Sequence, residues 1–113
     1  MSEVVLVRQQ LRPRKTEKLR EWCAELEARE DEVMETLDNE RVFTEARFLR
    51  SSEDGDFLFT FMEADDIEAT KEAVEASEFD IDDDHAEVMD DVLVSGSTEL
   101  LTPLDYFSNS ARM

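Results

Sequence analysis

Residues 42–63 read VFTEARFLRSSEDGDFLFTFME, and this stretch decides the fold of the 113-residue chain. Two runs rich in aromatic and β-branched residues flank a polar turn containing Asp54-Gly55, a pair that is typical of tight hairpin turns. If Asp54-Gly55 is the two-residue loop, Arg50 pairs with Phe59 and the two strands run antiparallel. The stretch therefore predicts a β-hairpin around which the rest of the chain is organised.

Alternation of side chains gives this hairpin two different faces. The first face is apolar, and we expect it to form the core; it carries Val42, Thr44, Ala46, Phe48, Phe57, Phe59 and Phe61. The second face is apolar around a charged pair, and it carries Phe43, Glu45, Arg47, Leu49, Leu58, Thr60 and Met62. Helices over one face would leave the second exposed as a patch larger than soluble monomers usually tolerate. The pattern therefore predicts a two-fold homodimer through the second face of the sheet.

Apolar periodicity places the remaining elements. Residues 3–11 predict a strand, and residues 16–37 predict one long amphipathic helix. Two shorter helices are expected between the hairpin and Gly96, and residues 98–107 predict a last strand. Strand, helix, hairpin, helices and strand in this order predict a ferredoxin-like βαββαβ arrangement. We expect a single α+β domain over residues 1–113, with an antiparallel four-stranded sheet and helices on one face.

The charge of the chain is strongly negative. Asp and Glu number 31 against 12 Lys and Arg, which gives a formal charge of −19. The acids are spread through apolar-periodic segments, which indicates a folded domain with an acidic coat. This profile is similar to that of halophilic proteins, because molar salt shortens the Debye length to about 3 Å and screens self-repulsion. No basic stripe is present to neutralise phosphates, so nucleic acid is not an expected partner.

Cysteine and apolar content predict the compartment. Cys23 is the only cysteine, which excludes an internal disulfide, and its place on an apolar helix face indicates a small core residue. No secretory signal is visible, and no segment approaches the roughly 20 apolar residues of a membrane span. We therefore expect a cytoplasmic protein with no membrane partner.

The chain resembles an uncharacterised family of haloarchaeal and bacterial proteins in the dimeric α+β-barrel superfamily. The matching features are Val5–Arg8, Arg12–Lys18, Glu45–Phe48 and Ser77–His85. Relatives often have a second histidine where this chain has Phe79, so the resemblance implies no two-histidine metal site here. The superfamily implies two ferredoxin-like protomers with their sheets pressed together and a small-molecule pocket. It includes cofactor-independent monooxygenases and haem-degrading enzymes.

The candidate site residues are few. His85 is the only histidine, on the inward stripe of a helix; it either packs structurally or acts as a general base or ligand contact. Glu45 is its possible partner. Glu45 and Arg47 either pair with charges across the dimer interface or form a polar pocket. Arg8 on a flanking strand can join either arrangement, and Trp22 is a weaker ligand-binding candidate.

The acidic run at residues 80–91 invites comparison with a calcium loop. Asp80, Asp82 and Asp84 fall at the first, third and fifth positions of such a loop. His85 stands where the turn needs glycine, and Asp91 where a bidentate glutamate is usual. Chance and the acidic composition account for the run, so we expect no metal site.

Two functions from different classes remain. The first is a small-molecule binding or regulatory module of unknown ligand, favoured because no nucleophile–base pair, metal constellation or cofactor site is visible. The second is a cofactor-independent enzyme of monooxygenase type that uses His85 and Glu45. If Glu45 and Arg47 hold a polar ligand, a cavity lined by aromatic side chains should open between the sheet and the helix that carries His85.

Overall fold

A computed structural model describes residues 2–109 of the chain. Its elements in order are β1 (Glu3–Gln10), α1 (Thr16–Ala28), α2 (Glu30–Glu40), β2 (Val42–Ser52), β3 (Gly55–Ala64), α3 (Ile67–Glu75), α4 (Asp80–Val92) and β4 (Glu99–Leu101). The strands form one sheet in the order β2-β3-β1-β4, and every neighbouring pair is antiparallel. The predicted α+β, ferredoxin-like fold is confirmed, with two helices in each crossover.

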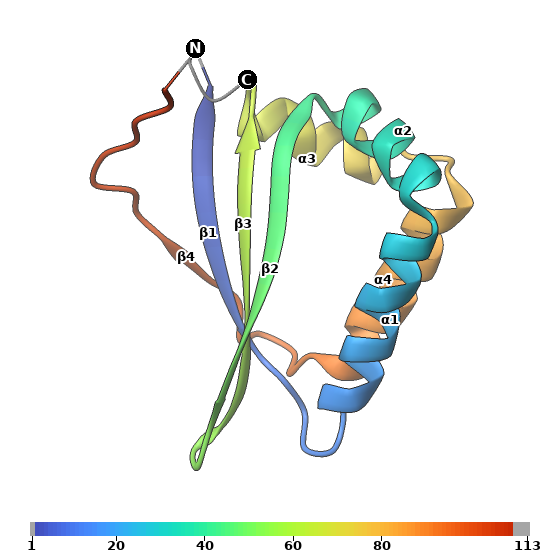
Figure 1. The fold of residues 1–113 in the computed structure, drawn as a ribbon, viewed down its shortest axis with the longest axis vertical. Coiled ribbons are helices and arrows are strands. Elements are labelled where there is room, and N and C mark those ends of the chain that lie inside the picture. Colours follow the sequence, from blue (N-terminus) through green and yellow to red (C-terminus); the bar gives the residue numbers. More distant parts are fainter. Residues whose placement is uncertain (1, 110–113) are drawn as a thin grey trace.

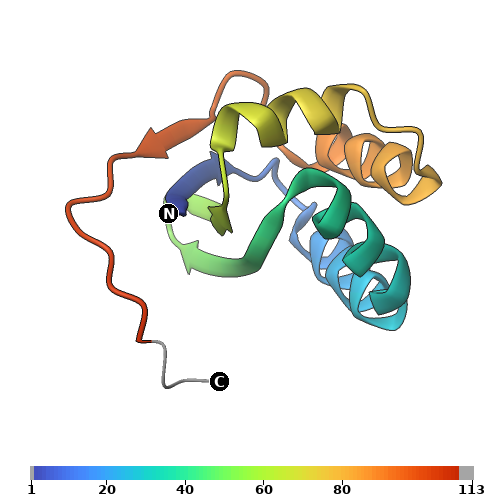
Figure 2. The same cartoon turned by 90° about the horizontal axis from the view of Figure 1, so that it is seen from above.

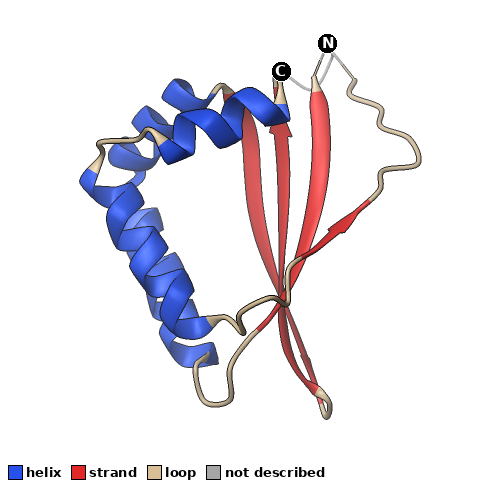
Figure 3. Cartoon of the chain, turned by 180° about the vertical axis from the view of Figure 1, so that it is seen from behind, coloured by secondary structure: helices blue, strands red, loops and turns tan. Residues whose placement is uncertain are grey.

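The helices lie together on one side of the sheet. Figure 1 shows the sheet nearly edge-on, with α1 to α4 on one side and the segment after β4 on the other. The view from behind in Figure 3 shows the same separation of helices and strands into two layers. The sheet therefore has a covered face toward the helices and an open face away from them.

The hairpin loop lies one residue earlier than predicted. Its two residues are Glu53-Asp54, and Gly55 begins β3 with a φ of 121°, a left-handed conformation that favours glycine. Arg50 consequently pairs with Phe57 instead of Phe59. The register differs from the prediction by two residues, so every side chain from Thr44 to Met62 keeps its face. Val42, which was predicted on the Phe48 face, pairs with Ala64 on the Leu58 face instead.

A β-bulge interrupts β2 near its start. Val42 pairs with Ala64 and Thr44 pairs with Glu63, which leaves Phe43 as an extra residue between two consecutive pairs. Val42 and Ala64 are buried, whereas Phe43 is 56% exposed. β2 bends toward α2 at this end, as the view from above shows (Figure 2).

The two faces of the hairpin are reversed relative to the prediction. Leu58, expected in the dimer interface, is 2% exposed and belongs to the core under the helices. Phe48, expected in the core, is 59% exposed on the open face. The covered face can contain the charges of Glu45 and Arg47 because these two side chains form an ion pair of 2.9 Å with each other. The predicted dimer interface at Leu58 and its neighbours is therefore wrong.

The predicted helix over residues 16–37 is two helices. The break is at Arg29, whose φ of −106° and ψ of 35° are not helical. Its guanidinium forms ion pairs with Glu25, Glu32 and Asp84 at 3.0, 2.8 and 3.1 Å. Since Asp84 lies on α4, the corner between α1 and α2 is tied to the second crossover.

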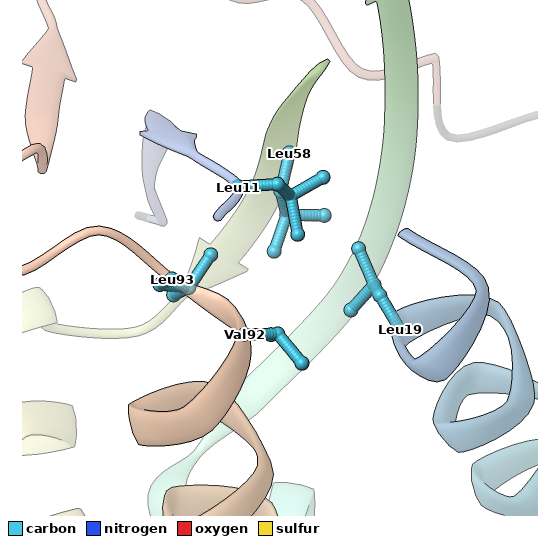
Figure 4. Close-up of a cluster of buried hydrophobic side chains, with 5 residues drawn as sticks. All are labelled: Leu11, Leu19, Leu58, Val92 and Leu93. Carbon is cyan, nitrogen blue, oxygen red and sulfur yellow. The ribbon is translucent and has the colours of Figure 1, made fainter. Parts of the chain in front are cut away.

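A compact apolar cluster closes one end of the space between the layers. It consists of Leu11, Leu19, Leu58, Val92 and Leu93, which Figure 4 shows converging from β3, the end of β1, α1 and α4. Each of these residues is at most 9% exposed. Full burial of such a side chain is worth roughly 1.5–3 kcal/mol, so this cluster anchors both crossovers to the sheet.

The acidic run is helical. Asp80 begins α4, and the first turn also contains Asp82 and Asp83, where carboxylates interact favourably with the helix dipole. In the part of the chain that the structure describes, no three His, Cys, Asp or Glu side chains are placed to hold a metal ion.

The last strand is shorter than predicted. β4 comprises three residues paired with β1, and the predicted strand over residues 98–107 does not continue past Leu101. Pro103 lies two residues beyond Leu101, and proline lacks the backbone N–H that a continuing ladder needs. Residues 102–109 lead away from the helices on the side of the open face (Figure 1).

Candidate functional site

A cavity of about 730 Å³ lies between the covered face of the sheet and the helices. Its volume is in the range of small-molecule sites. The wall is mostly aliphatic and methionine side chains, among them Val7, Leu26, Leu37, Met62, Ile81 and Met89. None of the described residues that line it is phenylalanine, tyrosine or tryptophan. The cavity is where the sequence placed it, but the predicted aromatic lining is wrong.

Glu45 and Arg47 contribute charge to this cavity from β2. Both line it, and Arg47 Nη2 lies 2.9 Å from Glu45 Oε1. They stand two residues apart on one strand, which places both side chains on the covered face. The pair therefore brings fixed charges, already partnered, into an otherwise apolar wall.

Glu40, which sequence reasoning missed, is the most perturbed carboxyl group of the cavity. It is the last residue of α2, is 7% exposed and lines the cavity. Burial raises its pKa to about 7, and the nearby charges of Asp82 and Glu45 add to the effect while Arg47 opposes it. A glutamate at a helix C-terminus opposes the helix dipole, and this was the one signal that could have identified it.

His85 lines the cavity from α4 as a neutral imidazole. Burial and the nearby charge of Arg47 lower its pKa to about 4. Nδ1 of the ring accepts a hydrogen bond of 2.9 Å from Nε1 of Trp22, so the proton of the neutral ring is on Nε2. His85 can donate a hydrogen bond to a ligand near pH 7, but its low pKa makes it a weak base.

Two predicted ligand contacts lie elsewhere. Trp22 is buried on α1 and is not among the residues that line the cavity; it orients His85 instead. Arg8 lies on the open face, where it forms a 3.3 Å ion pair with Glu99 and stacks over Phe57 at 4.2 Å from the ring centroid. We therefore take Arg8 out of the candidate site and assign Trp22 a positioning role.

Together these side chains form a polar cluster, which we define as Glu40, Glu45, Arg47, Asp82 and His85. α2, β2 and α4 supply its members, so only the folded chain brings them together. Cys23 also lines the cavity, but burial raises the pKa of its thiol, which keeps it protonated and unreactive. The arrangement can bind a polar group and exchange a proton with it through Glu40.

Two solved structures of similar fold, from different organisms, illustrate what this chain is similar to. Rv0793 from Mycobacterium tuberculosis has a TM-score of 0.55 and 24% identity, over 96% of this chain and 100% of that chain. A conserved protein from Methanosarcina mazei Go1 has a TM-score of 0.55 and 16% identity, over 89% of both chains. At these identities the likeness shows the fold alone.

Two further findings concern the membrane and the family. Within residues 2–109, no helix combines the length and apolar character that crossing a membrane requires. Among curated proteins, none matches the sequence. Residues 2–109 match DUF6176, a family of unknown function, and the chain therefore belongs to that family.

Proposed function

We propose that this protein is a small-molecule binding module whose cavity takes up an apolar molecule with one polar end. The observation that carries this proposal is the 730 Å³ cavity, in which an aliphatic wall meets the polar cluster. Apolar pockets with a few converging polar groups are the usual form of a ligand site. A core built only for stability would fill such a space, because an empty cavity forfeits dispersion contacts.

The charged groups support binding in preference to a purely structural role. Glu40 is buried with a pKa of about 7, and a carboxyl group in this state lowers the stability of the fold. Perturbed groups of this kind gather at functional sites, where their cost is offset by what they bind.

We also propose that the module works as a homodimer through the open face of the sheet. This face has an apolar centre of Leu6, Ala46, Phe48, Phe57, Phe59 and Phe61, and polar side chains border it, namely Arg8, Gln10, Arg50 and Glu99. The segment beside it also exposes apolar side chains, with Leu104 97% and Phe107 86% exposed. A second copy of the chain would cover both, in keeping with the resemblance to dimeric α+β barrels. The charge of −19 suits a salt-rich cytoplasm of the halophilic kind.

Native mass spectrometry of protein purified in high salt tests the binding function. We expect a bound small molecule that solvent unfolding releases. Thr60→Phe fills the cavity from β3 and should purify without the molecule, whereas Ala24→Phe, exposed on α1, should retain it. Wild-type protein free of any bound molecule, or a Thr60→Phe variant that keeps one, would exclude the cavity as the site.

A cofactor-independent monooxygenase is the second candidate, and the pKa of Glu40 favours it. A general base is most effective when its pKa lies near the working pH, as that of Glu40 does and that of His85 does not. In such a reaction the substrate supplies its own electrons: two hydrogens leave it as water with one oxygen atom, and the second oxygen atom enters the substrate. Oxygen uptake with the co-purified molecule that is absent in Glu40→Gln would support this candidate. Binding of the molecule without oxygen uptake would leave the small-molecule binding module as the function.

A further inference from the structure

The side chains that face the cavity have a strong excess of negative charge. Among the residues that the structure describes, five carboxyl groups line it, from Glu27, Glu30, Glu40, Glu45 and Asp82. One guanidinium, that of Arg47, faces them, and it is already paired with Glu45. The acidic coat of the protein explains the exposed carboxylates of α1 and α2. It does not explain a carboxyl group that is buried.

Glu40 is the group that the acidic coat does not explain. It is 93% buried, and among the described residues its carboxyl group has neither a hydrogen bond nor an ion pair. Every side-chain oxygen or nitrogen that is fully enclosed in residues 2–109 has a hydrogen-bond partner. The Glu40 oxygens are therefore not enclosed by protein, and they open onto the cavity that this residue lines.

The excess of negative charge favours a cationic ligand, and the chemistry of the cavity wall limits the kind of cation that fits. The described residues hold no group of three ligating side chains suited to a metal ion. The remaining wall is aliphatic, from Val7 and Met62 on the sheet to Leu37 and Met89 on the helices. An organic cation with an alkyl tail satisfies both parts of this surface.

We infer that the cavity takes an aliphatic amine, with its ammonium group against Glu40 and Asp82 and its alkyl tail along the aliphatic wall. This inference rests on the proposed binding function, because it names the ligand class of the same cavity. The ammonium would give Glu40 the partner it lacks and would offset the repulsion among Glu40, Asp82 and Glu45. Ammonium–carboxylate hydrogen bonds are charge-assisted and therefore strong.

Amine binding must then be linked to the ionisation of Glu40. The charged and titratable groups around it are Asp82 and His85 of α4 and the paired Glu45 and Arg47 of β2. His85 stays neutral between pH 6 and pH 8 because its pKa is about 4. With a pKa of about 7 for Glu40, the ionised fraction rises about tenfold from pH 6 to pH 8, and amine affinity should rise equally.

Isothermal titration with octylamine, octan-1-ol and octanoate separates the parts of this proposal. Potassium chloride at about 0.5 M suppresses binding of the amine to the acidic surface. At pH 8 we expect octylamine to bind at least tenfold more tightly than the alcohol, and octanoate most weakly. Glu40→Gln should remove the preference for the amine and its pH dependence. Glu35→Gln, which removes a charge from the exposed side of the same helix, should keep both.

The outcomes distinguish failure of the ligand class from failure of the cavity. Equal binding of the amine and the alcohol would overturn the amine class and leave a module for apolar molecules. Amine binding that persists in Thr60→Phe would place the ligand on the acidic surface and also overturn the inference. No binding of any of the three probes would count against the cavity itself as a site, and thus against the proposed function.

Discussion

Nε1 of Trp22 lies 2.9 Å from Nδ1 of His85 and donates a hydrogen bond to it, joining α1 to α4. This contact selects the tautomer of His85 with its proton on Nε2. We predict that Trp22→Phe, which keeps an aromatic ring but loses the donor, allows the other tautomer to form. Nitrogen NMR shifts of His85 at pH 7 measure this directly, and unchanged shifts would show that the hydrogen bond does not set the tautomer.

The pKa of His85 predicts acid lability. It is lowered from 6.5 to about 4, so the folded state binds fewer protons than the unfolded state between these values. The stability that this group contributes is complete above pH 6.5 and is lost as the pH falls toward 4, on the order of 2–3 kcal/mol. Urea unfolding of His85→Asn should show a smaller loss over that interval. Parallel pH profiles for the two proteins would contradict the assignment.

Glu40 predicts the opposite slope. Its pKa is raised from 4.5 to about 7, so the folded state binds more protons than the unfolded state and stability falls as the pH rises through this range. Glu40→Gln should therefore stabilise the protein by about 1–3 kcal/mol at pH 8 and have little effect near pH 4.5. Chemical unfolding at the two pH values tests the difference. An equal effect at both would mean that Glu40 does not titrate as proposed.

The formal charge of −19 predicts dependence on salt. Repulsion among the carboxylates destabilises the compact state, and salt screens it. We expect the melting temperature to rise steadily as potassium chloride increases from millimolar to molar concentration. A melting temperature that stays flat would remove the argument for a halophilic protein.

Two phenylalanines of β2 test which face forms the proposed dimer. Phe48 on the open face and Phe43 at the bulge are 59% and 56% exposed, so they differ in position and not in accessibility. Phe48→Asp should convert a dimer to a monomer, because a carboxylate would be buried without a partner in the interface. Phe43→Asp should leave the dimer intact. Light scattering in molar salt distinguishes these outcomes, and a monomeric wild-type protein would contradict the dimer.

The sequence predicted the element order, the two hairpin faces and a cavity near His85, because these depend on local periodicity and chain order. It did not predict which hairpin face the helices cover. Both faces are apolar, and the aromatic content of the Phe48 face and the charge of the Glu45 face both favoured the Phe48 face as the core. Burial of the Glu45 face is tolerated because Glu45 and Arg47 form an ion pair, which alternation alone does not reveal.

Two other features depend on contacts between distant segments. The helix break at Arg29 falls in a sequence of good helix formers, and the residue is held by Asp84, which is far along the chain. In the sequence, Glu40 is one polar residue among several at a helix end. Its burial and its raised pKa arise only when α4 and β2 bring Asp82 and Glu45 close to it.

The bulge at Phe43 limits where β2 can change its length. Removal of Phe43 would leave every other β2 residue opposite its present partner, because this residue is the extra one in the ladder. Loss of a single residue between Thr44 and Ser52 would instead turn part of the strand over. If β2 keeps its pairing at the hairpin end, loss of a residue between Arg47 and Ser52 would move the side chains of Glu45 and Arg47 to the open face of the sheet. Among relatives that keep the polar cluster, insertions and deletions in this strand should therefore collect at one position.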